Sequence, residues 1–392
     1  MGHSRARLLV LGGGAAGLLA AQTAAARGWR VTLLEANDRV GKKLLATGNG
    51  RCNLSNRAAL PEAYGPAASG FLLEPDKLLQ LMEGLGLATR TDEEGRVYPL
   101  CNQASAVLDV LRLGLERENV ETVCGFEAVS AAKNGEDFCL VARDGRRVTG
   151  QRLLLCAGGR AASKANGYAL AQALGHRLNP LAPALTYLKT DQSLVKGLQG
   201  QRLHGRIRLC RGQAVLAEEE GELLFKEGAL SGIAVFDLSR AWAGAKAACE
   251  LSVDLLPGWD GFRVRGELER RAALFPRSEQ LLTGLFPRLV GQRLLDACGL
   301  RPQAPAPSQA LDRLAALLRD WRFPVTGSGG FDQAQLTLGG VPLDEVEAGS
   351  LRSLRCEGLS LAGEMLDLHG PCGGFNLHQA FSTGYLAAAA LR

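Results

Sequence analysis

Two patterns are missing from this sequence of 392 residues, and each absence argues against a class of protein. The ten cysteines include no Cys-x-x-Cys pair, which disfavours a zinc site and a dithiol redox pair. Reduced thiols in a cytoplasmic protein are the simplest account of them. No uninterrupted apolar run reaches the ~18 residues that a membrane span needs. We therefore predict a cytoplasmic protein without a metal site or a membrane segment.

What the chain does contain is enough apolar sequence for a large core. Hydrophobic residues make up 46% of the chain and charged residues 22%. The length suggests about two or three domains. No internal repeat or low-complexity tract is visible, so the domains are expected to be ordinary globular ones.

The most informative pattern lies between residues 7 and 35. A short apolar run meets Gly12-x-Gly14-x-x-Gly17, an alanine-rich helical run follows, and a second apolar run ends on Glu35. This order is typical of a β–α–β unit that binds a dinucleotide: Gly12 permits a tight turn, Gly14 lets the backbone approach a pyrophosphate, and Gly17 allows close packing. The helix N-terminus offers N–H groups to the phosphates. Glu35 is suited to a ribose 2′-hydroxyl, which argues against a 2′-phosphate.

A second signal stands near the C-terminus. A short apolar strand ends on Gly363-Glu364, and a glycine-rich turn containing Gly373-Gly374 then leads into a helix at residues 377–391. N–H groups at such a helix start suit a carbonyl or a developing negative charge, which a flavin carries at its N1–C2=O edge. A glycine-rich cap on a packed helix is the alternative for this turn alone. With the strand that runs into Gly158-Gly159, the pattern favours FAD over a nicotinamide cofactor.

The secondary-structure pattern predicts an α/β protein interrupted by an insert. We expect a first FAD-binding part at residues 1–186, a β-rich and helical insert at 187–325, and a second FAD-binding part at 326–392. The main expected helices cover residues 107–119, 231–247, 262–298 with breaks at two prolines, and 308–320. The main expected strands cover several segments within 122–155, then 202–210, 213–217, 222–226 and 250–255, the acidic residues 218–221 forming a turn.

Positive charge is concentrated in two stretches. Residues 1–60 hold nine Lys or Arg against two acids, and no acid lies between Arg39 and Arg57. Within the insert, Lys196, Arg202, Arg206, Arg208 and Arg211 also lie in an acid-free run. The first stretch is compatible with a solvated face, with neutralisation of cofactor phosphates, or with RNA binding. The second suits either RNA or an exposed strand that is protected by charge, and we favour the strand.

These motifs resemble the HI0933-like flavoproteins, within the glutathione-reductase-type FAD superfamily. The resemblance covers essentially the whole chain, and its most specific motif is the segment 40–56, VGKKLLATGNGRCNLSN. It implies a Rossmann-type FAD-binding domain built from both chain ends, with an inserted β-barrel-like and helical domain. Three departures stand out: a shorter loop at 158–168, Lys226-Glu227 in place of Thr-His, and His378 in place of glutamine.

The resemblance also implies roles for individual residues. Gly12, Gly14, Ala16 and Gly17 should contact the pyrophosphate, with Glu35 at the adenosine ribose. The other expected cofactor residues are Lys43, Thr47, Arg51 and Asn53 along the cofactor, the backbone of Val129 at the adenine, Gly158 in its turn, Gly363 and Glu364 at the ribityl phosphate, and Gly374, Phe375, Asn376 and Leu377 at the flavin pyrimidine. We take Cys52 as inert. His378 is the best candidate for a catalytic proton donor.

The predicted activity is that of an FAD-dependent oxidoreductase. No second G-x-G-x-x-G unit occurs, so NAD(P)H is expected to bind transiently as the electron donor. We predict hydride transfer from reduced flavin to an activated C=C bond of a small molecule. The resemblance leaves two alternatives open: dihydrouridine formation in ribosomal RNA, and oxidation of a small amine by O₂. The sequence favours no particular oligomeric state.

Overall fold

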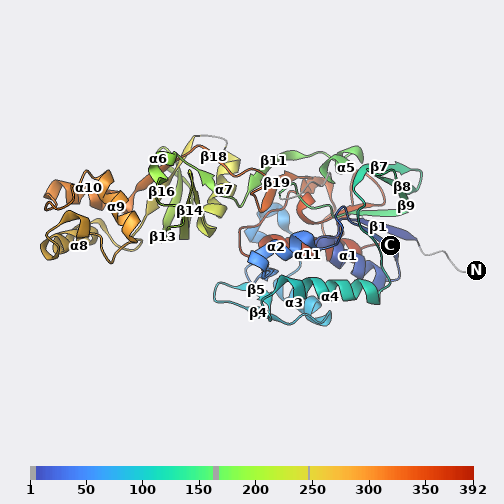
Figure 1. Cartoon of the computed structure of the whole chain (residues 1–392). Helices are drawn as coiled ribbons and strands as arrows, with labels where there is room; N and C mark the ends of the chain where they lie inside the picture. The colour runs from blue at the N-terminus through green and yellow to red at the C-terminus, as the bar shows by residue number, and fades with distance from the viewer. Residues whose placement is uncertain (1–5, 162–166, 246–247) are drawn as a thin grey trace, which may run out of the picture. The chain divides into compact units, whose positions relative to one another are not determined.

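The computed structural model describes residues 6–161, 167–245 and 248–392 (Figure 1). The chain folds into two compact units. Unit 1 combines Met1–Ala182 with Leu336–Arg392, and unit 2 is Pro183–Gln335. The boundaries of unit 2 therefore lie 4 residues before and 10 residues after those expected from the sequence, at 187 and 325.

The centre of unit 1 is a five-stranded parallel sheet in the order β20-β10-β1-β2-β6. Its strands are β1 (Arg7–Leu11), β2 (Arg30–Leu34), β6 (Glu121–Val123), β10 (Arg152–Leu155) and β20 (Leu359–Leu361). Four of these strands, β1, β2, β10 and β20, are rich in apolar residues and almost entirely buried, because helices and loops cover both faces of a parallel sheet, whereas the edge strand β6 is largely exposed. Since β20 comes from the C-terminal part and pairs with β10, both chain ends build this domain. The predicted α/β Rossmann-type fold is confirmed.

Two helices from opposite ends of the chain pack against each other in unit 1. These are α1 (Ala15–Ala26) and α11 (Phe375–Ala389), which lie side by side in Figure 1. A Cβ on Gly384 of α11 would lie 2.3 Å from the carbonyl oxygen of Ala16, so a glycine is required at this crossing. The small residues of α1 are buried nearly all round, which explains its alanine-rich sequence.

Smaller elements surround this sheet. The three-stranded sheet β3-β5-β4 and the three-stranded sheet β7-β8-β9 are both antiparallel, and β11 pairs with β19. Their strands are β3 (Ser55–Asn56), β4 (Thr89–Thr91), β5 (Arg96–Pro99), β7 (Ala128–Asn134), β8 (Asp137–Ala142), β9 (Arg147–Gly150), β11 (Asn179–Ala184) and β19 (Leu336–Gly340). The remaining α-helices of unit 1 are α2 (Lys42–Ala46), α3 (Pro75–Gly84), α4 (Ala104–Arg117) and α5 (Gly167–Ala173).

Unit 2 is built on a seven-stranded antiparallel sheet in the order β17-β16-β13-β14-β15-β12-β18. Its strands are β12 (Leu188–Lys189), β13 (Arg202–Arg211), β14 (Ala214–Lys226), β15 (Ala229–Ser231), β16 (Cys249–Asp254), β17 (Trp321–Val325) and β18 (Gly327–Ser328). The two edge strands, β17 and β18, are separated in the chain only by Thr326. The two edges of the sheet are therefore adjacent in the chain, which is compatible with the barrel-like form that the family resemblance implies.

Five α-helices complete the described part of unit 2. They are α6 (Gln192–Val195), α7 (Ile233–Ala245), α8 (Gly261–Leu274), α9 (Arg288–Ala297) and α10 (Ser308–Arg319). The expected break of the 262–298 helix at Pro276 and Pro287 is confirmed, since α8 ends before the first and α9 begins after the second. Proline lacks the N–H that a helix interior needs, so it stands at these boundaries.

The charged strands of unit 2 differ from the expectation at one point. The acidic residues 218–220 do not form a turn but lie inside β14, opposite the arginines of β13. Arg206 pairs with Glu220 at 3.1 Å and Arg208 with Glu218 at 2.5 Å. β13 is the antiparallel, charge-bearing strand that the sequence analysis favoured, with exposed and buried residues alternating along it, and it lies between β14 and β16. Cross-strand attraction overrides the low strand propensity of consecutive glutamates.

Candidate cofactor site

In the glycine loop after β1, the fold requires glycine at positions 12 and 17 but not at position 14. A Cβ on Gly17 would lie 1.8 Å from the carbonyl oxygen of Gly12, and a Cβ on Gly12 would lie 2.2 Å from that of Cys156. A Cβ on Gly14, in contrast, would meet nothing within 4 Å. Gly14 precedes Ala15 and Ala16 at the N-terminus of α1, where no side chain caps the first N–H groups of the helix. This is the geometry that a bound pyrophosphate requires.

Glu35 supports this loop directly. Its side chain is 8% exposed, and its Oε2 accepts a hydrogen bond of 2.7 Å from the backbone N–H of Gly13. Its Oε1 accepts from the N–H of Asn37 at 2.8 Å. The carboxylate therefore ties the end of β2 to the glycine loop, and its role at a ribose remains a prediction.

An ion pair joins the two sequence motifs that lie farthest apart. Lys43 Nζ lies 2.7 Å from Glu364 Oε2, and the other carboxylate oxygen accepts from the backbone N–H of Thr337 at 2.9 Å. A Cβ on Gly159 would lie 2.3 Å from Glu364 Oε1, so this glycine leaves room for the carboxylate. Three chain segments therefore meet at Glu364.

The turn before Glu364 is held by α11. Gly363 has a φ of 76°, and its N–H donates to Thr383 Oγ1 at 2.8 Å while its carbonyl oxygen accepts from Gln379 Nε2 at 2.9 Å. Thr383 and Gln379 are buried. The sequence analysis missed both residues, because nothing in an alanine-rich helix marks which polar side chains face a turn.

The segment from Thr47 to Asn53 brings a buried amide to the start of α11. Asn53 Oδ1 is inaccessible to solvent and has no hydrogen-bond partner among the described residues. A Cβ on Gly374, whose φ is 103°, would lie 2.6 Å from this oxygen. Thr47 donates to the carbonyl oxygen of Leu44 at 2.6 Å. Burial raises the pKa of the Cys52 thiol to about 12, which fits the inert role expected for it.

The glycine-rich turn at residues 370–376 is closed by its own side chains. Asn376 Oδ1 accepts from the N–H of Gly370 at 3.0 Å, and Asn376 Nδ2 donates to the carbonyl oxygen of Gly370 at 3.0 Å. The hydroxyl of Tyr64 donates to the carbonyl oxygen of Phe375 at 2.7 Å, and their rings meet edge to face. The side chain of Asn376 is therefore committed to the turn, and Leu377 packs against the core of unit 1.

The structure argues against His378 as a proton donor and corrects that expectation. The side chain is fully buried, and its Nε2 donates to the carbonyl oxygen of Leu73 at 2.9 Å. Its Nδ1 then accepts from the hydroxyl of Ser55 at 2.9 Å. Burial lowers the pKa of His378 to about 4, so the ring is neutral near pH 7. Both ring nitrogens are occupied, and His378 links α11 to β3.

The remaining predicted cofactor residues, Val129, Gly158 and Arg51, share no hydrogen bond, ion pair or ring contact with one another in the described ranges. Val129 is 39% exposed and lies where the register of β7 shifts against β8. Gly158 has a φ of 72°, and a Cβ there would meet nothing within 4 Å. Arg51 is exposed, and its guanidinium lies over the ring of Tyr98. Residues 162–166 of the shortened loop at 158–168 lie outside the described residues.

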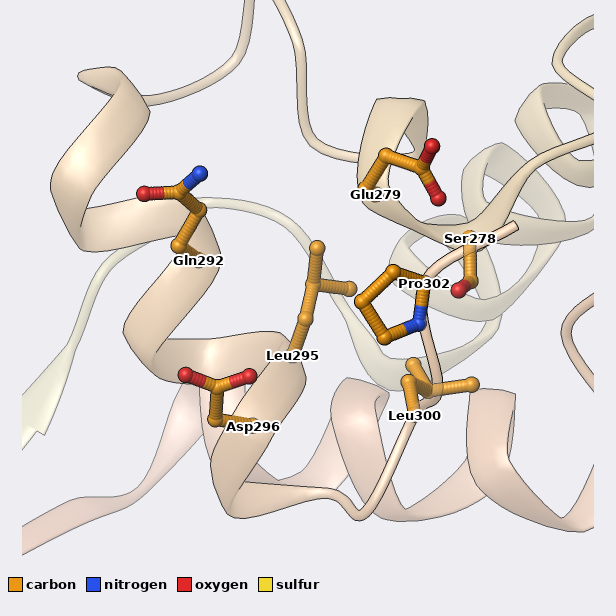
Figure 2. A pocket seen from close by; sticks show the side chains of 7 residues that line it. All are labelled: Ser278, Glu279, Gln292, Leu295, Asp296, Leu300 and Pro302. Carbon is orange, nitrogen blue, oxygen red and sulfur yellow. The ribbon is translucent and has the colours of Figure 1, made fainter. Parts of the chain in front are cut away.

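Unit 2 holds a separate pocket of ≈ 180 Å³ beside α9. Figure 2 shows the residues that line it, which are Ser278, Glu279, Gln292, Leu295, Asp296, Leu300 and Pro302. Its volume is below the roughly 300–1,000 Å³ of typical ligand sites. Glu279 is already used, since its Oε2 accepts from the N–H of Gln303 at 2.5 Å. None of the predicted site residues lies in this pocket.

Three further observations concern the described ranges alone. No group of three or more His, Cys, Asp or Glu side chains there is arranged to hold a metal ion. No helix within them is long and apolar enough to cross a membrane. Each of the ten cysteines, all of which lie in the described ranges, is a free thiol.

The parallel sheet and the glycine loop at its carboxyl edge define a Rossmann-type dinucleotide-binding protein. Residues 6–390 match the family model of the HI0933-like protein Rossmann domain, and the chain belongs to this family. The 3-dehydro-bile acid delta(4,6)-reductase of Clostridium scindens is 36% identical over 405 residues, which cover 98% of each chain. The ribosomal RNA dihydrouridine synthase of Escherichia coli is 27% identical over 401 residues, covering 97% of this chain and 96% of that protein.

Two solved structures share the fold at low sequence identity. A flavocytochrome c3 fumarate reductase superposes with a TM-score of 0.52 at 14% identity, covering 99% of this chain and 78% of the other. The 3-ketosteroid delta1-dehydrogenase of Sterolibacterium denitrificans gives a TM-score of 0.50 at 13% identity, covering 99% of both chains. The solved structures show the fold, and the family membership with the 36% identity to a reductase identifies the chain as an enzyme, an FAD-dependent oxidoreductase. The open faces at Gly14 and Gly158 and the unpartnered oxygen of Asn53 fit such a cofactor.

Proposed function

We propose that this enzyme reduces an activated C=C bond in a small steroid-like ketone, with NAD(P)H as the electron donor. The observation that carries the proposal is the 36% identity, over 98% of both chains, to a bile acid delta(4,6)-reductase. An enone C=C bond is electron-poor, so it is the natural acceptor for a hydride. When bound, reduced FAD supplies that hydride.

The chain's own residues would bind and orient the cofactor. The N–H groups at the start of α1 would hold the pyrophosphate, because Gly14 leaves that surface open. Lys43 and Glu364 would hold the middle of the cofactor, where their ion pair joins the two chain ends. The start of α11 at Gly374 would face the flavin pyrimidine and stabilise negative charge there.

The proton that completes the reduction would not come from His378. That ring is neutral near pH 7, and its one N–H is given to the carbonyl oxygen of Leu73. The proton donor is therefore solvent or another residue at the substrate face.

The test uses the purified FAD-loaded protein under anaerobic conditions. We expect NADH or NADPH to bleach the flavin absorbance and a 3-oxo-Δ4 steroid to restore it, with formation of the saturated ketone. The proposal would be contradicted if both NADH and NADPH reduced the flavin only slowly. It would also be contradicted if a small amine reduced the flavin and only O₂ restored the oxidised form. A protein that binds no FAD on reconstitution would contradict the whole assignment.

A second candidate is dihydrouridine formation in ribosomal RNA. It is favoured by two relatives, the dihydrouridine synthases of Escherichia coli and Haemophilus influenzae, at 27% and 25% identity. The cross-strand ion pairs of β13 and β14 weigh against it, because they neutralise arginines that an RNA backbone would need. Restoration of the oxidised flavin by ribosomal RNA fragments, and not by the steroid, would favour this candidate.

A further inference from the structure

One buried polar atom beside the start of α11 has no hydrogen-bond partner. The amide oxygen Oδ1 of Asn53 is inaccessible to solvent and accepts no hydrogen bond from any residue that the structure describes. Buried amide groups of folded proteins are almost always hydrogen-bonded, because the hydration that they lose must be replaced. An exception at a predicted cofactor residue points to a ligand that supplies the missing donor.

The loop before Asn53 holds this side chain at a fixed place. The backbone is left-handed at Asn49 and Cys52, with φ of 55° and 57°, a conformation that residues other than glycine rarely adopt. The N–H of Cys52 donates to the carbonyl oxygen of Thr47 at 3.0 Å and closes the loop. A Cβ on Gly48 would lie 2.9 Å from the backbone nitrogen of Asn53. Strained backbone that is enforced by its surroundings is typical of functional sites.

The amide lies against the N-terminus of α11. A Cβ on Gly374 would lie 2.6 Å from Asn53 Oδ1 and 2.2 Å from the carbonyl oxygen of Ser55, so glycine is required for this close approach. No side chain caps α11, and the N–H of His378 donates to the carbonyl oxygen of Gly374 at 3.0 Å. The N–H groups of residues 375–377 precede this first turn and have no partner within the helix. An acceptor from Asn53 therefore lies beside several N–H donors.

This combination matches the pyrimidine edge of an oxidised flavin. That edge carries carbonyl groups at C2 and C4, and between them the N3–H, which is the one hydrogen-bond donor of the oxidised ring. The N–H groups of α11 suit a carbonyl oxygen at which negative charge develops. Asn53 offers the acceptor that the N3–H needs. A pyrophosphate, which presents acceptors alone, would leave the Asn53 oxygen unsatisfied.

The amide can present its oxygen to a ligand by rotating about its own side chain. The inward oxygen is closed to solvent, but Asn53 as a whole is only half-buried. A half turn about χ2 exchanges the amide oxygen and nitrogen, which are similar in size. The NH₂ group then lies near the carbonyl oxygen of Ser55, which adjoins the same side of Gly374. This rotation places a donor at the inward position and an acceptor at the outward one.

We propose that the amide oxygen of Asn53 accepts a hydrogen bond from the flavin N3–H when FAD is bound. This inference rests on the placement of the flavin pyrimidine at the start of α11, which belongs to the proposed function, and it adds the residue that recognises N3. Asn53 makes no hydrogen bond through its oxygen in the cofactor-free protein and gains one in the complex. Its removal should therefore weaken FAD binding without weakening the fold.

The test compares FAD with 3-methyl-FAD, in which a methyl group replaces the N3 hydrogen, by fluorescence titration of the cofactor-free protein. Wild type should bind 3-methyl-FAD about tenfold more weakly than FAD, because the donor is lost and the methyl group meets the amide. Asn53→Leu should weaken FAD binding about tenfold and bind the two flavins with nearly equal affinity. Asn53→Ala should lose the preference in the same way. Asn134→Leu, at an exposed asparagine that ends β7, is the matched control and should keep both wild-type affinities.

Urea unfolding of the cofactor-free protein separates recognition of the flavin from a structural role. Asn53→Leu should unfold at the urea concentration of wild type or above it, since no hydrogen bond of the side-chain oxygen is lost. Equal affinity of wild type for the two flavins would overturn the inference. So would a variant that loses stability and FAD affinity together but keeps the wild-type preference for FAD over 3-methyl-FAD. If no steroid is reduced but the preference depends on Asn53, the proposed function fails and this inference stands.

Discussion

Lys43 and Glu364 are 321 residues apart in the sequence, yet their charged atoms lie 2.7 Å apart. Glu364 is 17% exposed and Lys43 39% exposed, so water screens this pair only in part. Glu364 also accepts from the backbone N–H of Thr337. This contact fixes the C-terminal motif against the N-terminal one, and both motifs belong to the proposed cofactor site.

Glu364→Gln is expected to loosen this junction. The amide keeps the shape of the side chain but removes the charge, so Lys43 loses its partner. We expect the FAD-free protein to lose about 1–2 kcal/mol of unfolding free energy, since the pair is partly buried. FAD affinity should fall in parallel. Urea unfolding of the apo protein and flavin fluorescence titration measure the two effects. Lys42→Met, at an exposed pair with Asp38 of 3.8 Å, is the control and should change neither.

Alanine substitutions at Gly14 and Gly17 should distinguish an effect on FAD binding from an effect on the stability of the fold. Gly14→Ala adds a methyl group in open space on a backbone with a φ of −85°, which alanine tolerates, so the apo stability should not change. FAD affinity should fall at least tenfold, because the methyl group would occupy the surface that we propose for the pyrophosphate. Gly17→Ala places a methyl group against the carbonyl oxygen of Gly12 and should cost about 3 kcal/mol of stability.

Gly84→Ala serves as the control for both variants, because a Cβ on this α3 residue also meets nothing. It should leave FAD affinity unchanged. If Gly14→Ala binds FAD as tightly as wild type does, the pyrophosphate does not lie at the N-terminus of α1.

The sequence predicted the parallel sheet well because its signal is local. Four of the five strands are short apolar runs, and the glycine spacing after β1 reports steric limits that are visible in the structure at Gly12 and Gly17. The Lys43–Glu364 pair was not predicted, although both residues were assigned to the site. Partners so far apart leave no periodicity or spacing that sequence alone can show.

The two wrong predictions, for residues 218–220 and for His378, also arise from partners that lie far away in the sequence. The acidic residues 218–220 indicated a turn because glutamates have low strand propensity, and only the facing arginines of β13 make a strand favourable there. His378 was a reasonable proton donor by its position near a glycine-rich helix start. Its burial against Ser55 and Leu73 depends on β3 and the segment before α3, which the local sequence does not reveal.

His378→Gln is expected to reduce the pH dependence of stability. The pKa of His378 lies at about 4 in the folded protein and near 6.5 when unfolded, so the unfolded chain binds the extra proton between these values. The stabilising effect of keeping the ring neutral is complete above pH 6.5 and is lost as the pH falls toward 4. The shift corresponds to about 3 kcal/mol at most.

Urea unfolding at pH 7.5, 6 and 5 measures this effect. The pKa of buried His176 is also lowered by desolvation, so the variant should flatten the profile without abolishing its slope. Steroid reduction near pH 7 should persist in the variant, because the ring does not donate the proton. A loss of kcat with unchanged FAD binding would instead restore His378 to a catalytic role.

The ion pairs between β13 and β14 predict how the protein responds to RNA. Arg206 and Arg208 face Glu220 and Glu218, so the positive charge of β13 is already compensated. Replacing both arginines with glutamine should change RNA affinity by less than twofold and should cost only a small stability, since exposed pairs contribute about 0.2–1 kcal/mol each. Replacing Glu218 and Glu220 with glutamine should instead uncover the arginines and increase nonspecific RNA binding at low salt. Filter binding with a ribosomal RNA fragment at 50 and 200 mM salt measures both variants. A large loss of affinity in the arginine variant would show that β13 binds RNA despite its acidic partners.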